Sequence, residues 1–144
     1  MAKKEQKSKA QIKAEKAKKA TYFTIDDLVL KKKQKEESTT KLMDVYVEAS
    51  NRKLKCKKPS DQQALDVLDE IGDDKSIVNM AEAYVDMIYD CTPMLQNEEY
   101  QKQLGIVDPR EMVTAIFEIG ERFDIGNQLM KGLGFADIDE DIKN

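Results

Sequence analysis

The sequence contains no histidine and no tryptophan, and only two cysteines and three prolines occur among its 144 residues. The absence of histidine excludes histidine-based acid–base pairs, Ser-His-Asp and Cys-His triads, and most transition-metal sites. No P-loop or GxGxxG motif is present, because the GLG at 132–134 is too short and follows a predicted helix rather than a strand. We therefore expect a protein that is not an enzyme and that needs no cofactor and no metal.

The two cysteines, Cys56 and Cys91, lie far apart and form no CxxC motif. Neither has a visible base or orienting partner, so we expect both to be reduced residues of the core or its edge. No window of about 18 apolar residues exists, and the basic N-terminus lacks the apolar region of a secretory signal. These features predict a cytoplasmic protein without a membrane span.

Charge is divided unevenly along the chain. Residues 1–58 carry 18 Lys/Arg against 8 Asp/Glu, a net +10, whereas residues 59–144 carry 6 against 20, a net −14. Residues 1–21 form a basic arm with eight lysines in its first twenty positions, which predicts either disorder or an undocked, fraying helix. Binding to nucleic acid through phosphates is the less favoured interpretation, because no arginine and no aromatic residue precedes Tyr22 and Phe23.

The segment after the arm predicts a short helix and then a hairpin. Thr24 suits a helix N-cap, and Ile25, Leu28 and Val29 form a short apolar face by which we expect this helix to dock before it projects into solvent. Apolar and polar residues then alternate over 42–57 on both sides of a turn at Ser50-Asn51, which predicts a β-hairpin. The alternating apolar positions are Met43, Val45, Val47, Leu54 and Cys56.

Helical patterns occupy residues 60–131. Ser60 and Gln63 predict a capping box for a helix that ends at Gly72, and its apolar stripe is predicted to be Leu65, Leu68 and Ile71. A helix of about four turns should then run from 77 to Pro93, followed by a short helix that begins at Asn97 and ends at Gly105.

The strongest local signal is Asp108-Pro109-Arg110-Glu111, which predicts a capped helix start with a staple between Val107 and Met112. This helix should continue through Phe117, and a further helix should cover 121–131. The expected fold class is mainly α (α+β), with about four to five short helices, an N-terminal β-hairpin and a basic arm. The domains are expected at 1–21 for the arm, 22–132 for a single domain, and 133–144 for a loose acidic tail.

Seven methionines in a small, charged chain suggest adaptable apolar surfaces, although each one separately is better explained as a core residue. A groove near the junction at Pro93 could accept a helical or extended segment of a partner. Met94 and Leu95 are the preferred exposed pair, because they follow the helix break. The predicted partner-binding residues are Tyr84, Ile88, Met94, Leu95, Tyr100 and Leu104.

The order of these segments resembles a known family. TIDDLV, then a β element ending in KKPS, then IYDCTPML, GIVDPREMV and EIGERF are similar to the XkdN-like tail assembly chaperones of tailed phages and of prophages in Gram-positive bacteria. The likeness covers roughly residues 22–132, and its motifs are packing and capping signals without catalytic residues.

The resemblance implies a small, non-enzymatic, largely helical protein of the host cytoplasm. Its partners would be the tape-measure protein and, as a second partner, the tail tube protein, and it would be absent from the finished virion. Two alternatives stay open: a small nucleic-acid-associated protein that uses the lysine-rich arm, and a structural tail adaptor that remains in the particle. Nothing in the residues indicates the oligomeric state.

Overall fold

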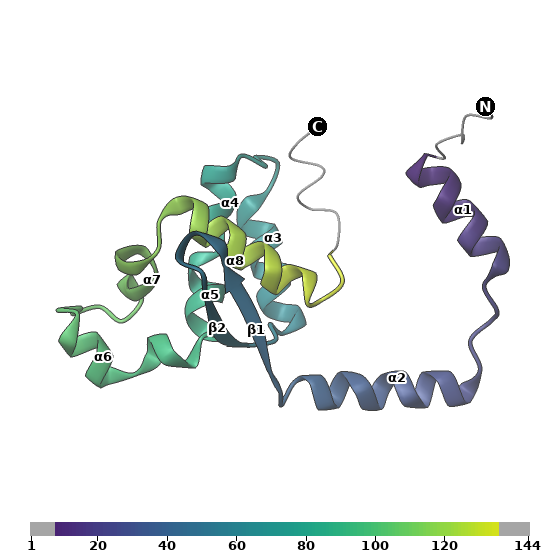
Figure 1. Ribbon diagram of the computed structural model, residues 1–144, viewed down its shortest axis with the longest axis horizontal. Helices are drawn as coiled ribbons and strands as arrows, with labels where there is room; N and C mark the ends of the chain where they lie inside the picture. The colour runs from purple at the N-terminus through teal and green to yellow at the C-terminus, as the bar shows by residue number, and fades with distance from the viewer. Residues whose placement is uncertain (1–7, 136–144) are drawn as a thin grey trace. The chain divides into compact units, whose positions relative to one another are not determined.

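The computed structural model describes residues 8–135 (Figure 1), and the chain divides into two compact units, residues 1–35 and 36–144. Helix α1 (Lys9–Lys19) begins with a capping box, formed by Ser8 and Gln11. Helix α2 (Ile25–Ser38) begins where Thr24 and Asp27 exchange hydrogen bonds of 2.9 and 3.2 Å, which confirms Thr24 as the N-cap.

The docking of α2 by its first turns stays a prediction, because α2 belongs largely to the first unit and is described here by itself. No residue of α2 is buried, and Ile25 and Val29 are 75% and 62% exposed. The apolar face of α2 is short, because the polar run KKKQKEE follows Leu30 directly. Helix α1 likewise has no buried residue.

The second unit contains a two-stranded antiparallel hairpin and a group of short helices. The mainly helical fold class with one hairpin is confirmed, whereas the eight α-helices in the described residues exceed the four to five that we predicted. The elements are β1 (Leu42–Val47), η1 (Glu48–Ser50), β2 (Arg52–Lys57), α3 (Asp61–Ile71), α4 (Ile77–Ala83), α5 (Val85–Cys91), η2 (Pro93–Gln96), α6 (Glu98–Gln103), α7 (Glu111–Ile116) and α8 (Ile119–Lys131).

The hairpin lies where the alternation predicted it. Val45 pairs with Leu54, and Asn51 takes the left-handed conformation with φ 50° at the turn. The edge of β1 meets α8, because the Gln128 side chain donates to the Tyr46 carbonyl at 2.7 Å and accepts from its N–H at 3.0 Å. One side-chain amide thus satisfies the two backbone groups that a third strand would otherwise pair.

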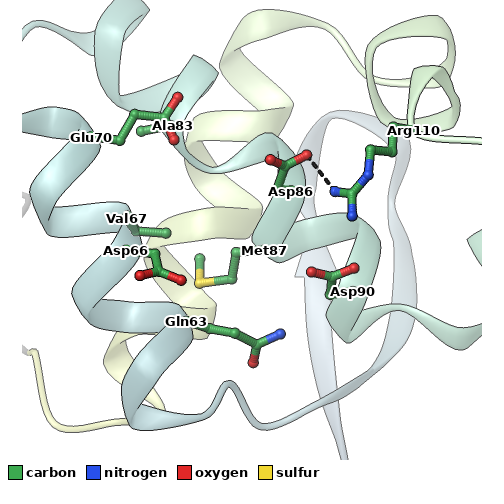
Figure 2. A pocket seen from close by; sticks show the side chains of 9 residues that line it. All are labelled: Gln63, Asp66, Val67, Glu70, Ala83, Asp86, Met87, Asp90 and Arg110. Atoms are coloured by element: carbon green, nitrogen blue, oxygen red, sulfur yellow. Dashed lines mark hydrogen bonds and ion pairs between the residues drawn. The ribbon is translucent and has the colours of Figure 1, made fainter.

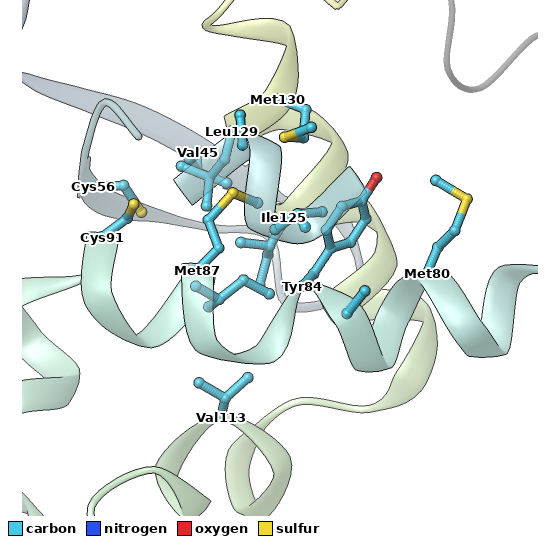
Figure 3. Close-up of a cluster of buried hydrophobic side chains, with 14 of the residues drawn as sticks. Val45, Cys56, Met80, Tyr84, Met87, Cys91, Val113, Ile125, Leu129 and Met130 are labelled. Carbon is cyan, nitrogen blue, oxygen red and sulfur yellow. The ribbon is translucent and has the colours of Figure 1, made fainter. Parts of the chain in front are cut away.

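The core lies between α8, the α4–α5 segment and the inner face of the hairpin (Figure 3). Tyr84 is completely buried, and its hydroxyl donates to Asn127 Oδ1 at 2.6 Å. Helix α8 passes so close to this ring that residue 126 must be glycine, since a Cβ there would overlap the ring atoms. The fully buried large side chains include Ile88, Met112, Ile125, Leu129 and Met130.

Two details of the α3–α5 region differ from the prediction. The buried stripe of α3 is Ala64, Val67 and Ile71, an i, i+3, i+7 row, so Leu65 and Leu68 are exposed instead. Counting only the larger residues concealed this row, because Ala64 is small. The predicted helix from 77 to Pro93 is divided at Tyr84 into α4 and α5, although i→i−4 hydrogen bonds continue on both sides of it.

The start of α7 also differs. Asp108 Oδ1 accepts from the Arg110 N–H at 3.1 Å, which forms a turn rather than a helix cap. Val107 is 95% exposed, so the staple with Met112 does not form. Helix α7 ends at Ile116, and α8 starts two residues earlier than predicted.

The early start of α8 follows from a capping box between Glu118 and Glu121. At its other end, Leu133 and Phe135 pack against the core, so the packed region extends beyond the predicted boundary at 132. The rest of the predicted acidic tail, 136–144, lies outside the described residues.

Substituting Gly126 with alanine should destabilise the protein by about 3 kcal/mol, because the new methyl group forces the buried Tyr84 ring or α8 to move. Urea unfolding followed by circular dichroism measures this change. Gly120→Ala is the matched control, since it lies in the same helix with no atom within 4 Å of the added Cβ, and it should leave stability unchanged or slightly higher. Equal effects of the two substitutions would contradict the packing described.

Candidate partner-binding surfaces

The structure separates the six predicted partner-binding residues into two groups. Three of them belong to the core: Tyr84, Ile88 and Leu95, at 0%, 0% and 3% exposure. The other three face solvent: Met94, Tyr100 and Leu104, at 59%, 43% and 55% exposure. Only the second group is exposed in this structure, whereas the first group lies in the core, so partner binding stays a prediction that Met94, Tyr100 and Leu104 can carry directly.

Leu95 is buried because the junction after Pro93 is an ordered 3-10 turn, η2. Successive residues of such a turn point about 120° apart, so Met94 and Leu95 do not face the same side. The turn is held in place by Gln101, whose side-chain amide donates to the Leu95 carbonyl at 3.0 Å. The expected exposed pair is therefore a single exposed methionine beside a core leucine.

The exposed group continues past α6. Asn97 caps this helix by accepting from the Tyr100 N–H at 3.2 Å, as its position predicted. Tyr100 and Leu104 are four residues apart and lie on one side of the helical turn, and Val107 follows in the next loop. We name the four residues Met94, Tyr100, Leu104 and Val107 the α6 surface.

A second feature, which the sequence did not suggest, is a cleft of about 180 Å³ between α3 and α5 (Figure 2). Its walls carry carboxylates at i, i+4 spacing: Asp66 and Glu70 on α3, and Asp86 and Asp90 on α5. Apolar side chains lie between the walls, namely Val67, Ala83 and Met87. The two rows of carboxylates come together only because α3 packs beside α5. No short sequence motif predicts this packing.

The electrostatics of this cleft are dominated by negative charge. Partial burial, together with repulsion from Asp86 and Glu82, raises the pKa of the Glu70 carboxyl. Arg110 Nη1 is 2.7 Å from Asp86 Oδ1, and its guanidinium lies 5.8 Å from the centre of the Tyr89 ring. One cation therefore stands beside four carboxylates, and the cleft is suited to receive further positive charge.

The two cysteines are buried, free thiols in the core (Figure 3), as predicted. Burial, with a smaller contribution from Cys56, raises the pKa of Cys91 to about 12. Burial also raises the pKa of Cys56, whose sulfur lies 3.4 Å from Thr92 Oγ1. A thiol that keeps its proton at neutral pH is a poor nucleophile, so neither is suited to covalent catalysis.

Within residues 8–135, no group of three His, Cys, Asp or Glu side chains is arranged to hold a metal ion. No helix in the same range is both long enough and apolar enough to cross a membrane. Comparison of the chain with protein-family models, with curated proteins and with solved structures gave no match.

The native thiols should react with a thiol reagent at pH 8 far more slowly than the unfolded ones. With its pKa at about 12, Cys91 has a thiolate fraction roughly a thousandfold below that of an unfolded cysteine. The measurement is the rate of disulfide exchange with an aromatic disulfide, with and without denaturant. Rapid labelling of the folded protein would show that the site opens without unfolding.

The raised pKa of Cys91 also predicts a pH dependence of stability. Between about pH 9 and 12 the unfolded thiol has lost its proton while the folded one keeps it, so the unfolded state binds fewer protons. The free energy of unfolding should fall as pH rises through this window, and the fall should be smaller in Cys91→Ala. Urea unfolding at several pH values, compared between the two proteins, checks the difference.

Proposed function

We propose that this chain is an assembly chaperone that binds the tape-measure protein of a phage tail in the host cytoplasm. The α6 surface is the observation that carries the proposal, since it presents four apolar side chains from a region that resembles the family. The resemblance of TIDDLV, IYDCTPML and GIVDPREMV in their order supports the same assignment. The proposal includes no catalytic step and no cofactor, and tail tube protein is the second partner.

The physical reasoning concerns the client. A tape-measure protein is a long chain of helical, partly apolar segments, and such segments aggregate unless their apolar faces are covered. A chaperone needs moderate, reversible contacts repeated along the client rather than one tight pocket. Adaptable apolar contact is supplied by the exposed side chains of Met94, Tyr100 and Leu104. A hydrated polar rim is formed around them by neighbouring polar residues, including Asn97 and Glu98.

The double substitution Met94→Asp and Leu104→Asp should reduce binding of the tape-measure protein by about a hundredfold or more, because two charges enter the apolar contact. A tagged pull-down after co-expression with the long coiled-coil protein encoded nearby measures the loss. Both side chains are exposed, so the far-UV circular dichroism should stay unchanged.

Val78→Asp is the matched control for this experiment. Val78 is 54% exposed, close to the 55% of Leu104, but it lies on α4. Binding should survive Val78→Asp. Binding that survives Met94→Asp with Leu104→Asp would place the client contact elsewhere, and a client that never co-purifies with the wild-type chain would overturn the proposed function.

The alternative of a structural tail adaptor predicts a different location for the protein. Mass spectrometry of purified phage particles should find no copies of an assembly chaperone, whereas an adaptor stays in the particle in fixed amount.

A nucleic-acid-associated protein is a second candidate, favoured by one specific observation. Tyr22 and Phe23 are 97% and 70% exposed and lie a few residues after the lysine-rich helix α1. Exposed aromatic rings beside lysines suit the stacking of single-stranded bases.

This second candidate predicts that a single-stranded oligonucleotide binds, that binding weakens steeply with salt, and that Tyr22→Ala with Phe23→Ala weakens it by about tenfold. Fluorescence anisotropy at several salt concentrations provides the measurement. Binding that ignores both salt and the two aromatic residues would exclude it.

A further inference from the structure

One edge of the hairpin has main-chain groups that point away from both strands. Gln128 bonds to the N–H and to the C=O of Tyr46, so these two groups of β1 point away from β2. In an antiparallel pair the residue directly opposite points its own groups away from β1, and that residue is Lys53. The direction alternates along a strand, so Lys55 and Lys57 also point their N–H and C=O groups outward.

These outward groups have no hydrogen-bond partner within residues 8–135. The hydrogen bonds made outside the helices and the hairpin ladder include none to the main chain of Lys53, Lys55 or Lys57. Buried main-chain groups are nearly always paired, so unpaired ones are expected to meet water. We name the N–H and C=O groups of these three lysines the β2 edge. Such an edge is a template for an incoming strand.

The side chains beside the β2 edge are basic. Lys53, Lys55 and Lys57 occupy alternate positions of β2, so their side chains lie together on the exposed face of the hairpin. The Nζ atom of Lys55 lies 2.6 Å from Asp44 Oδ1, across the hairpin. Among the described residues, Lys53 and Lys57 have no carboxylate partner, so two positive charges beside the edge are not neutralised.

The other face of the hairpin is apolar next to this edge. Leu54 is partly buried and packs against the core, and Cys56 is completely buried. A strand added to β2 would place its side chains alternately beside the lysines and beside Leu54. The sequence pattern that fits both faces is therefore an alternation of acidic and apolar residues.

We propose that the β2 edge binds an extended, acidic segment of a partner protein as a third strand. The main chain of the segment pairs with Lys53, Lys55 and Lys57, as in other cases of strand addition. Its carboxylates lie beside the lysines, and its apolar side chains lie beside Leu54. The main-chain hydrogen bonds give affinity, and the lysines select the charge of the segment. No residue of the α6 surface takes part, so the contact is independent of the proposed function.

Two other occupants fit this edge less well. The same edge of a second copy would set lysine against lysine, and like charges directly opposite each other destabilise a strand pair. Residues 137–141 of this chain, DIDED, have acidic side chains at alternate positions. Helix α8, however, ends on the β1 side of the hairpin, where a Cβ at Gly132 would lie 3.4 Å from Met43 Sδ. The open edge belongs to β2.

Nuclear magnetic resonance titration of the isotope-labelled full chain tests the contact. The probe is a capped peptide of about eight residues that alternates aspartate and valine. It should bind with a Kd of about 0.1 to 1 mM, shift the amide signals of Lys53, Lys55 and Lys57 most, and slow their hydrogen exchange. A peptide that alternates lysine and valine should not bind, because the lysines of β2 repel it.

Methylation of the peptide backbone distinguishes strand pairing from charge attraction alone. In antiparallel pairing the aspartates lie directly opposite the lysines, and their N–H groups face β2. N-methyl groups on the aspartates should therefore abolish binding, whereas N-methyl groups on the valines should change it by less than about twofold. The two methylated peptides have the same charge and composition, so each is the matched control for the other.

Charge reversal in the protein tests the selection of acidic segments. Lys53→Glu with Lys57→Glu should weaken binding of the aspartate peptide by about tenfold or more, because two carboxylates replace two lysines beside it. Lys75→Glu with Lys102→Glu is the control, since it makes the same change in net charge at exposed positions outside the hairpin. The control should bind the peptide like the wild type, and both variants should keep the wild-type circular dichroism.

Three results would overturn the proposal. The first is a wild-type chain whose β2 amide signals do not move at the highest soluble peptide concentration. The second is an equal effect of the two methylated peptides, which would exclude strand pairing. The third is binding that appears only in the variant Asp137→Asn with Asp139→Asn and Asp141→Asn, which would assign the edge to the chain's own acidic residues instead of a partner.

Discussion

The ring of Tyr84 lies against the backbone of Gly126, where α8 packs on the α4–α5 segment, and the tyrosine is completely buried. Its hydroxyl reaches Asn127 in the next position, and Gln128 then pairs both backbone groups of Tyr46 in the hairpin. Three consecutive residues of α8 therefore fix the central helices on one side and the sheet on the other. The hydrogen bonds restrict how the elements are oriented, and the contact with the ring restricts how closely they approach. Together they define one arrangement rather than a loosely packed set of short helices.

The surfaces follow from this arrangement. With α5 held by its buried face, its opposite side turns Asp86 and Asp90 toward α3, whose own buried row leaves Asp66 and Glu70 on the facing side. The same packing buries Leu95 at the end of the segment and leaves Met94 outside. Each short helix uses one side to build the core and leaves another side exposed. The acidic cleft and the α6 surface are formed by the sides that the core does not use.

Local signals in the sequence predicted local structure well. The capping box at Ser60, the left-handed Asn51 of the hairpin turn and the cap at Asn97 all appear as their chemistry requires, because each involves atoms only a few residues apart. The failures came from tertiary packing. The buried row of α3 includes the small Ala64, which a search for large apolar residues overlooks, and Asp108 makes a turn where its motif is typical of a helix cap.

The binding surfaces were less predictable for the same reason. Three of the six proposed residues are core, because apolar character alone does not distinguish a residue that builds the fold from one that meets a partner. The cleft depends on two helices separated by α4 in the chain, so no window of sequence contains it. What the sequence did show is the segregation of charge, and the structure locates part of the negative half in the carboxylates on the two walls of the cleft, where the sequence alone could not place them.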